Sequence, residues 1–423
     1  MADDRAGATR RTVLYNGPRL RAIMADHDLR ALIGTTPENV GYLADHVGWA
    51  QQTYRDVESF VILSFEPSES VDVVLTRQDN TYYATFGGTG GRVESYGGAP
   101  ALRLPDGGAA LTEEEVRYLA LHESGRRNRS GADAVAAALR ERGITSGRVG
   151  VDPVGCSAAT LAALSDLLPS CEFLPAGDAF LMARLVKTTA ELERMRDAAL
   201  LNETAMDAAL ANAGAGVSER EIAATWRAEV ARGGASWQWF HIGSGRRSAF
   251  IFPPTDKTLA AGDVAVIDAG LRLGNYFSDI GLCLVVGEPS ERVRKNWEIV
   301  YQAFADGLER IRAGVTAPEI FDAIVAGMRA RGWDDFSPPH VGHTIGIEPR
   351  EFPYTLSPAR SYSNPFLPDT SAIPLPASSV INVEIPVGEL GVGGYQIEKT
   401  LVITPDGYEE LVPQPRNIRV LDG

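Results

Sequence analysis

The chain has 423 residues, of which 44% are hydrophobic and 22% charged, and its formal net charge is −15. This length suffices for two domains with separate cores, and the composition is that of an ordinary globular protein. The acidic excess argues against a nucleic-acid partner, which needs a cationic face. Three cysteines without a CxxC spacing provide neither a disulfide framework nor a thiolate zinc site.

The N-terminal segment and the apolar runs bear on localisation. The first twelve residues, MADDRAGATRRT, are polar and lack the apolar core of a signal peptide. No run approaches the roughly 20 apolar residues that a membrane span needs. We therefore expect a cytoplasmic protein without a membrane partner.

Residues 13–185 alternate between helix-like and strand-like segments, which predicts an α/β domain. The Gly-rich stretch at 86–100 is expected to be a loop, and it is too irregular to bind phosphate. The expected helices cover 19–29, 37–44, 132–143 and 158–168, and the expected strands cover 31–36, 58–65, 70–76, 148–152 and 171–176.

A second domain is expected over residues 188–423. Thr188 with Glu191 forms a capping box that starts a long helix, and Ser218 with Glu221 starts the next. Helices and antiparallel strands segregate along this half, which indicates an α+β domain. Strands are expected around 264–287 and 380–404, with helices at about 290–312 and 316–331 between them.

The segment at 264–287 combines a hairpin pattern with two carboxylates. Two apolar runs flank LRLGN, which predicts antiparallel strands. With a turn centred on Leu273 and Gly274, Asp268 and Asp279 become direct cross-strand partners, with Cβ atoms roughly 4.5–5.5 Å apart. Two ionised carboxylates at that distance repel each other, so we expect a cation between them.

The strands around 380–404 repeat this pattern. Glu384 and Glu398 each lie within an apolar strand, and Lys399 points to the face opposite Glu398. Burying isolated carboxylates costs several kcal/mol unless partners are supplied. A solvated acidic sheet face is the alternative, which two such pairs of carboxylates disfavour.

The four carboxylates, with the Gly-flanked His343 in VGHTIG, form a hard and oxygen-rich set of donors. Such a set suits Mn, Co, Fe or Zn better than a thiolate-bound metal. Four acidic ligands also exceed what one divalent ion needs for charge balance. Two divalent metal ions are therefore expected.

These residues resemble the pita-bread metallohydrolases, which include aminopeptidase P, prolidase, methionine aminopeptidase and the metal-free creatinase. The resemblance begins at RLVKTTAELERMRDAA and continues through the aspartate hairpin and GHTIGIEPRE to the two glutamate strands. It implies five metal ligands, which are Asp268, Asp279, His343, Glu384 and Glu398.

The resemblance also implies an architecture and a mechanism. The architecture is an N-terminal creatinase-like domain at 13–185, a pita-bread catalytic domain at 188–423, and a homodimer. In the mechanism, a hydroxide that bridges two metal ions attacks the scissile carbon, Glu384 handles the proton, and the ions stabilise the oxyanion.

The sequence departs from typical peptidases of this family around the ligands. Arg350 replaces a histidine seven residues after the ligand histidine, and Phe252 replaces one seven residues beyond a GSG turn. Pro339 replaces a third, with His340 one step closer to the ligand, and the common R-I-E-D reads Q-I-E-K from Gln396. Metal binding is expected to persist, while the groups that position a peptide differ.

Three side chains are candidates for substrate contact. Arg350 either pairs with Glu348 or Glu351, or grips a substrate carboxylate or an oxyanion, and we favour the second role. His340 is assigned to catalysis and substrate binding, as is Arg350, and His241 to substrate binding. The aromatic residues near His241 are expected in the core, with an aromatic wall for a cationic group as the alternative; they are Trp237, Trp239 and Phe240.

Three hypotheses about function follow. The five ligands favour cleavage of an amide-type C–N bond in a small peptide, as in Xaa-Pro aminopeptidases and prolidases. Phe252, Arg350 and Gln396 favour the same metal site acting on a small non-peptide substrate, as in ectoine hydrolases or dimethylsulfoniopropionate lyases. A non-catalytic binding protein ranks last, because such relatives usually lose metal ligands and none is lost here.

Overall fold

The computed structural model describes residues 13–46, 48–65, 71–88, 91–98, 101–104, 110–250, 252–359, 373–413 and 417–423. The chain divides into two compact units, Met1–Ala183 and Arg184–Gly423. The first is an α/β unit and the second an α+β unit, as the alternation and segregation of the segments predicted. Within the described ranges, no helix combines the length and the hydropathy needed to cross a membrane.

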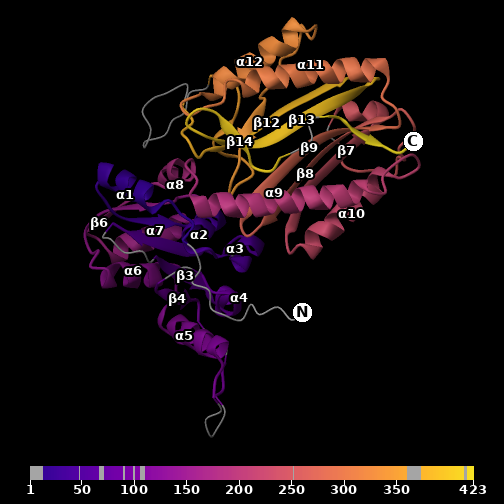
Figure 1. Ribbon diagram of the computed structural model, residues 1–423. Coiled ribbons are helices and arrows are strands. Elements are labelled where there is room, and N and C mark those ends of the chain that lie inside the picture. The colour runs from indigo at the N-terminus through magenta and orange to yellow at the C-terminus, as the bar shows by residue number, and fades with distance from the viewer. Residues whose placement is uncertain are drawn as a thin grey trace. The chain divides into compact units, whose positions relative to one another are not determined.

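The N-terminal unit is a mixed sheet with helices packed on it (Figure 1). Its strands are β1 (Leu29–Gly34), β2 (Phe60–Ser64), β3 (Asp72–Thr76), β4 (Val93–Tyr96), β5 (Gly147–Val151) and β6 (Cys171–Pro175). Its helices are α1 (Gly17–Asp26), α2 (Pro37–Ala44), α3 (Trp49–Thr53), α4 (Asn80–Phe86), α5 (Glu113–Arg127), α6 (Gly131–Glu141), α7 (Ala158–Leu167) and α8 (Gly177–Arg184), the last of which ends at the first residue of the second unit. In the described residues the strand order is β4-β3-β2-β1-β5-β6, and apolar residues of the central strands pack with α6 and α7.

The predicted loop at 86–100 is wrong in part, because Val93–Tyr96 forms β4 at the edge of this sheet. β4 pairs in parallel with β3, and its Glu94 and Ser95 are buried. The Asn128 amide donates to the Glu94 carboxylate at 2.9 Å and to the Ser95 carbonyl at 3.0 Å. The strand is short and lies between glycines, so its sequence pattern gives little sign of a strand. Its contacts with β3 and Asn128 stabilise the strand conformation.

The C-terminal unit contains two sheets. Their strands are β7 (Ser236–Ser244), β8 (Val264–Leu273), β9 (Tyr276–Val286), β10 (Gly342–Thr344), β11 (Glu351–Thr355), β12 (Val380–Glu389), β13 (Gly393–Ile403), β14 (Tyr408–Glu410) and β15 (Arg419–Leu421). The helices are α9 (Thr189–Leu210), α10 (Glu219–Arg232), α11 (Glu291–Leu308) and α12 (Ala317–Ala330). Among the described residues one sheet has the order β15-β9-β8-β7 and the other β11-β10-β12-β13-β14.

Helices cover the outer side of each sheet, and the sheets face each other. In Figure 1, α9 and α10 lie along the sheet of β7, β8 and β9, while α11 and α12 lie over β12 and β13. Apolar side chains form a core between each helix pair and its sheet. Val266 and Cys283 of the first sheet also reach the core of the second. The sheet faces between these cores carry the polar residues described below.

The predicted capping boxes are confirmed at the first two helices of this unit. The Thr188 hydroxyl accepts from the Glu191 amide at 3.2 Å, and the Glu191 carboxylate accepts from the Thr188 amide at 2.8 Å. Ser218 and Glu221 make the same reciprocal bonds before α10. Each box satisfies backbone donors that the first helical turn leaves unpaired, and this fixes where α9 and α10 begin.

The β8–β9 hairpin turns at Gly274 and Asn275, one residue later than the predicted centre implies. Leu273 pairs with Tyr276, and the two residues between them have φ angles of 53° and 73°. Positive φ at both central positions is the requirement of a two-residue type I′ turn, and glycine and asparagine meet it at low cost. The turn therefore sets the register of the whole hairpin.

The predicted direct pairing of Asp268 with Asp279 is wrong. Asp268 lies opposite Gly281, and Asp279 lies opposite Gly270. The displaced turn shifts the register by two residues, so both carboxylates stay on the same face and become diagonal neighbours. The two carboxylates still repel each other as diagonal neighbours. The residue directly opposite each aspartate is a glycine.

Replacement of Gly274 by valine is expected to lower the free energy of unfolding by about 1–2 kcal/mol, because a β-branched residue is strained at positive φ. Asn275→Gly keeps a residue that tolerates positive φ and is expected to change stability by less than about 0.5 kcal/mol. Urea unfolding followed by circular dichroism compares the two variants. Equal loss of stability in both would show that the turn conformation does not limit the hairpin.

Candidate metal centre and substrate cavity

The two facing sheets of the C-terminal unit bring all five predicted ligands together. Asp268 lies on β8 and Asp279 on β9, within one sheet. Glu384 and Glu398 lie directly opposite each other on β12 and β13, and His343 lies on β10 of the same sheet. Rigid, paired strands therefore position every member of the cluster.

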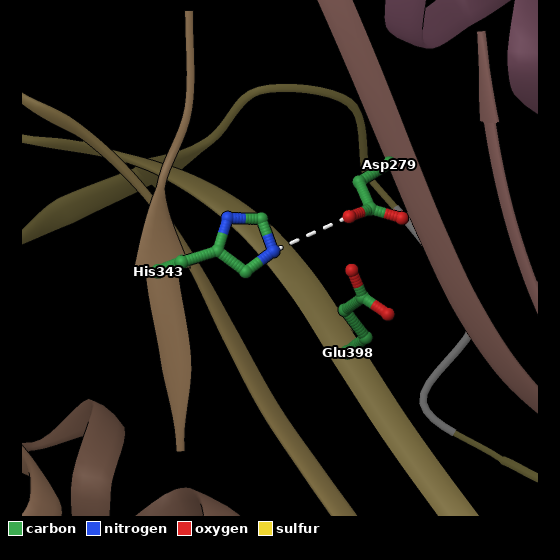
Figure 2. Close-up of side chains that lie close together, drawn as sticks. All are labelled: Asp279, His343 and Glu398. Atoms are coloured by element: carbon green, nitrogen blue, oxygen red, sulfur yellow. Dashed lines mark ion pairs between the residues drawn. The ribbon is translucent and has the colours of Figure 1, made fainter. Parts of the chain in front are cut away.

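The possible ligand atoms form two overlapping groups. Asp279, His343 and Glu398 form one, which Figure 2 shows, and Asp268, Glu384 and Glu398 form the other. Within each group the ligand atoms lie within 4.8 Å of one another. Glu398 belongs to both groups, so the arrangement can hold two cations that share its carboxylate.

Burial and mutual repulsion make three of these carboxylates, Asp268, Glu384 and Glu398, costly to ionise. Burial, with the charges of Asp279 and Glu384, raises the pKa of Asp268 to about 8. Burial and the neighbouring carboxylates raise the pKa of Glu398 well above its usual range, and burial is the largest cause of the raised pKa of Glu384. These raised pKa values favour the protonated carboxyl groups. A bound cation would favour the ionised carboxylates instead.

Two further observations show that the residues present fit divalent metal ions. Asp279 Oδ1 is buried and meets no hydrogen-bond donor among the described residues. His343 Nδ1 lies 3.1 Å from the Thr344 carbonyl oxygen, which places a proton on Nδ1 and leaves Nε2 directed at Asp279 Oδ2, 3.3 Å away. An imidazole oriented in this way, beside an oxygen without a donor, is typical of a metal ligand.

The protonation of His343 reflects the same environment. Burial, the largest cause, lowers the pKa of its imidazole, but Asp279, Glu384 and the Thr344 carbonyl together raise it by more, so the net shift of the pKa is upward. Without a cation, the contact between Nε2 and Asp279 requires a second ring proton. A metal ion in that place removes the requirement, since a neutral imidazole can then bind through Nε2.

Neutral amides support the ligands from outside the cluster. Gln396 Nε2 donates to Asp268 Oδ2 at 3.3 Å and to Glu398 Oε2 at 3.1 Å. The Asn382 amide donates to Glu398 Oε1, and Thr400 Oγ1 donates to Asn382 at 3.0 Å. Gln396 thus connects ligands from both sheets, a role that strand alternation alone did not reveal.

A cavity of about 1000 Å³ opens onto the cluster. Four of the five ligands lie in its wall, and all three predicted substrate-contact residues, His241, His340 and Arg350, line it as well. The remaining wall is mostly aromatic and proline side chains. They include Trp239, Phe250, Trp333, Phe336, Pro338, Pro339, Pro349 and Pro386.

The two histidines of the cavity lie close to the carboxylates. His340 Nδ1 lies 3.6 Å from Glu384 Oε1. His241 lies directly opposite Asp268 in the β7–β8 pairing, and burial lowers its pKa, which favours a neutral imidazole at neutral pH. Both are placed to contact a substrate that approaches the cluster.

Arg350 does not make the structural pairing that was its alternative role. Among the described residues no ion pair joins it to Glu348 or Glu351. Arg184 contacts Glu348, and its Nε lies 3.3 Å from Glu351 Oε1. Lys187 Nζ lies 2.6 Å from Glu351 Oε2. Both glutamates therefore have other cationic partners, and Arg350 is left on the cavity wall.

The aromatic residues near His241 divide between core and cavity. Phe240 packs in the core, as expected, while Trp237 is 49% exposed. Trp239 lines the cavity, and its indole Nε1 donates to Asp268 Oδ1 at 2.6 Å. The expectation of core packing is therefore wrong for Trp237 and Trp239, and the alternative of an aromatic wall describes Trp239.

The chain matches metallopeptidase family M24 over residues 193–405 and the creatinase/prolidase N-terminal domain over residues 18–186. It is 31% identical over 250 residues to an Xaa-Pro dipeptidase of Pyrococcus furiosus, a match that covers 58% of this chain and 68% of that protein. It is 27% identical over 278 residues to the uncharacterized peptidase YqhT of Bacillus subtilis, covering 65% of this chain and 75% of the relative.

Solved structures share the fold. An X-Pro aminopeptidase from Thermotoga maritima MSB8 has a TM-score of 0.71 at 25% identity, covering 93% of this chain and 98% of that one. An Xaa-Pro dipeptidase from Bacillus anthracis has a TM-score of 0.72 at 23% identity, covering 96% and 98%. The chain belongs to metallopeptidase family M24 and carries a creatinase/prolidase N-terminal domain.

Membership of this family makes the protein a metal-dependent hydrolase with divalent metal cofactors and a peptide or small-molecule substrate. The predicted resemblance to pita-bread metallohydrolases is thereby confirmed at the level of family and fold. The roles of the individual site residues stay predictions that the geometry supports.

Arg350→Ala is expected to lower kcat/KM by roughly 10- to 100-fold, because a hydrogen bond to a charged group contributes about 1.5–3 kcal/mol. Thermal stability should change little, since Arg350 has no ion pair to Glu348 or Glu351 among the described residues. Arg294→Ala, which removes an exposed ion pair with Glu288, is the matched control and should leave both quantities unchanged. Unchanged activity in Arg350→Ala would return this residue to a surface role.

Proposed function

We propose that this protein is a dinuclear-metal hydrolase that cleaves an amide-type C–N bond in an Xaa-Pro dipeptide or a similar small peptide. The observation that carries the proposal is the presence of Glu398 in both ligand groups. Four carboxylates fit the charge of two divalent ions better than that of one, and the donor set suits Mn, Co, Fe or Zn. Manganese is the first ion to test.

The ions, when bound, would activate a water molecule for attack and stabilise negative charge on the oxygen of the scissile carbonyl. Glu384 lies in the cavity wall and is placed to accept the proton of the attacking water and to pass it to the leaving nitrogen. His340, 3.6 Å from Glu384, is placed to donate a hydrogen bond to the substrate carbonyl as charge develops on it.

The cavity also offers groups for the two ends of a dipeptide. Arg350 is permanently charged and can bind a C-terminal carboxylate through two parallel hydrogen bonds. Aromatic and proline side chains of the wall can pack against the pyrrolidine ring, which is apolar and compact. His241 lies beside Asp268, where the N-terminal residue of the substrate would approach.

The further predictions of a cytoplasmic homodimer and of domains at 13–185 and 188–423 belong to the same proposal. The Xaa-Pro dipeptidase relatives support the general type of protein. Light scattering of the purified protein measures the oligomeric state.

Metal content provides the direct test of the dinuclear centre. The wild-type protein, loaded and then freed of excess metal, is expected to retain about two ions per chain. Glu398→Ala should lose both ions, because Glu398 belongs to both groups, whereas Asp268→Ala should lose about one. Mass spectrometry of the metal released on denaturation gives these ratios. No metal in loaded wild-type protein would contradict the proposal.

A second candidate keeps the metal site and changes the substrate to a small non-peptide, as in an ectoine-hydrolase-like C–N hydrolase or a dimethylsulfoniopropionate-lyase-like enzyme. The observation that favours it is Arg350 on the cavity wall, where typical peptidases of the family have a histidine. Gln396, which contacts Asp268 and Glu398 in place of an arginine, is a second departure near the centre.

A substrate screen distinguishes the two candidates. Manganese- and cobalt-loaded enzyme is expected to hydrolyse Xaa-Pro dipeptides with a free carboxylate faster than the same dipeptides with an amidated C-terminus, because Arg350 requires a charged partner. Small cyclic amidines and lactams form the comparison set, with amine release as the measurement. Activity on these compounds without any dipeptide turnover would replace the first candidate by the second.

A further inference from the structure

A bulge in β7 directs Trp239 toward the metal centre. Trp237 pairs with Leu271 and Trp239 pairs with Gly270, so Gln238 is an extra residue between them. One inserted residue disrupts the ladder locally and changes the direction of the neighbouring side chains, and such bulges are common beside active sites. After the bulge, Trp239 lies on the same face of the sheet as Asp268, the predicted ligand on β8.

Gly270 provides the space that the indole occupies. A Cβ atom built on Gly270 would lie 2.1 Å from Trp239 Cζ2, far inside van der Waals contact. The ring of Phe277 lies nearly parallel to the indole, at an angle of 18° and a centroid distance of 6.4 Å. The indole is therefore confined by the strand beneath it and by an aromatic neighbour on β9.

From this position the indole contacts a predicted metal ligand. Trp239 Nε1 donates to Asp268 Oδ1 at 2.6 Å, and Gln396 Nε2 donates to Asp268 Oδ2 at 3.3 Å. Among the described residues each oxygen of Asp268 thus has a donor of its own, which fixes the plane of the carboxylate. Asp279 differs, because its Oδ1 has no donor among the described residues.

The same indole forms part of the substrate cavity. A substrate group that contacts this wall would therefore contact the indole that donates to Asp268. The indole N–H is a donor only and does not titrate, unlike a histidine N–H.

We propose that Trp239 is a positioning residue, which fixes the Asp268 carboxylate for the metal ion of its group and at the same time forms the substrate wall. The proposal rests on the proposed metal centre. In this chain, the Trp239 indole, for which Gly270 leaves the space, both shapes the cavity and orients a ligand of one metal position. The shape of the cavity and the binding of that ion therefore depend on the same side chain.

The test compares Trp239→Phe, which keeps an aromatic ring and removes the N–H donor, with Trp237→Phe on the same strand. Trp237 is exposed and is not part of the cavity wall, so it is the matched control. Calorimetric titration of the metal-free proteins with Mn²⁺ is expected to show a roughly 10- to 100-fold weaker affinity for one ion in Trp239→Phe, as is usual when a partner of a metal ligand is lost. The other ion should bind as in the wild type.

A spectroscopic measurement gives a readout that does not depend on turnover. The visible absorption of the cobalt-loaded protein is expected to change in Trp239→Phe and to remain that of the wild type in Trp237→Phe. Gly270→Ala should weaken the binding of the same ion selectively, because its Cβ displaces the indole without removing it. Thermal unfolding of the metal-free proteins shows whether each variant folds.

The outcomes separate this proposal from the proposed function. Wild-type protein that binds no Mn²⁺ contradicts the metal centre itself. Two ions in the wild type with unchanged affinities in Trp239→Phe overturn only the role of Trp239. Equal weakening of both ions, or failure of both Trp239→Phe and Gly270→Ala to fold, also overturns it, since either result would make the contact a general structural one.

Discussion

Repulsion between four carboxylates on two facing sheets is the constraint on which the catalytic unit depends. Glu384 lies directly opposite Glu398, and Asp268 and Asp279 are diagonal neighbours on the other sheet. Burial of such a set without cations forces protonation or unfolding. The apolar cores on the outer side of each sheet stabilise the unit enough to hold these charges together. The free energy of unfolding that the cores contribute offsets the destabilising repulsion at the site.

Glycines leave the space that the groups around the metal centre occupy, and Gly281 allows the two sheets to approach closely there. A Cβ atom at Gly281 would lie 1.9 Å from Glu398 Oε2 and 2.4 Å from Gln396 Nε2. Gly281 stands opposite Asp268, and Gly270 stands opposite Asp279. Each aspartate is thus paired with a glycine, and the space above each glycine is filled by a group that contacts the ligands. Trp239 fills one such space and Glu398 with Gln396 fills the other.

Sequence reasoning predicted the strands and the four carboxylates that cluster, because a carboxylate inside an apolar, alternating strand is visible without the fold. The role of these residues and of His343 as metal ligands, which the family resemblance implied, stays a prediction. Sequence reasoning placed the hairpin turn one residue too early, since LRLGN allows two turn positions and only Gly274 with Asn275 provides two positive φ angles. It missed the bulge at Gln238, because Trp-Gln-Trp reads as regular alternation. The double contact of Gln396 depends on sheet-to-sheet packing, which no local pattern encodes.

The buried ion pairs at the start of this unit explain why Arg350 faces the cavity. Arg184 and Lys187, both 2% exposed, hold Glu351 at the start of β11, and the Glu351 carboxylate also accepts from the Ile347 amide at 3.0 Å. Removing one partner of such a set is costly, because it leaves a charge buried without compensation. The turn between His343 and Glu351 is therefore anchored at its end, and its exposed residue Arg350 is presented to the space in front of the ligands. Glu351, in a structural ion-pair cluster, and Arg350, a cation proposed to bind substrate, are thus adjacent in the chain. They differ in burial, since Glu351 is buried and Arg350 is exposed.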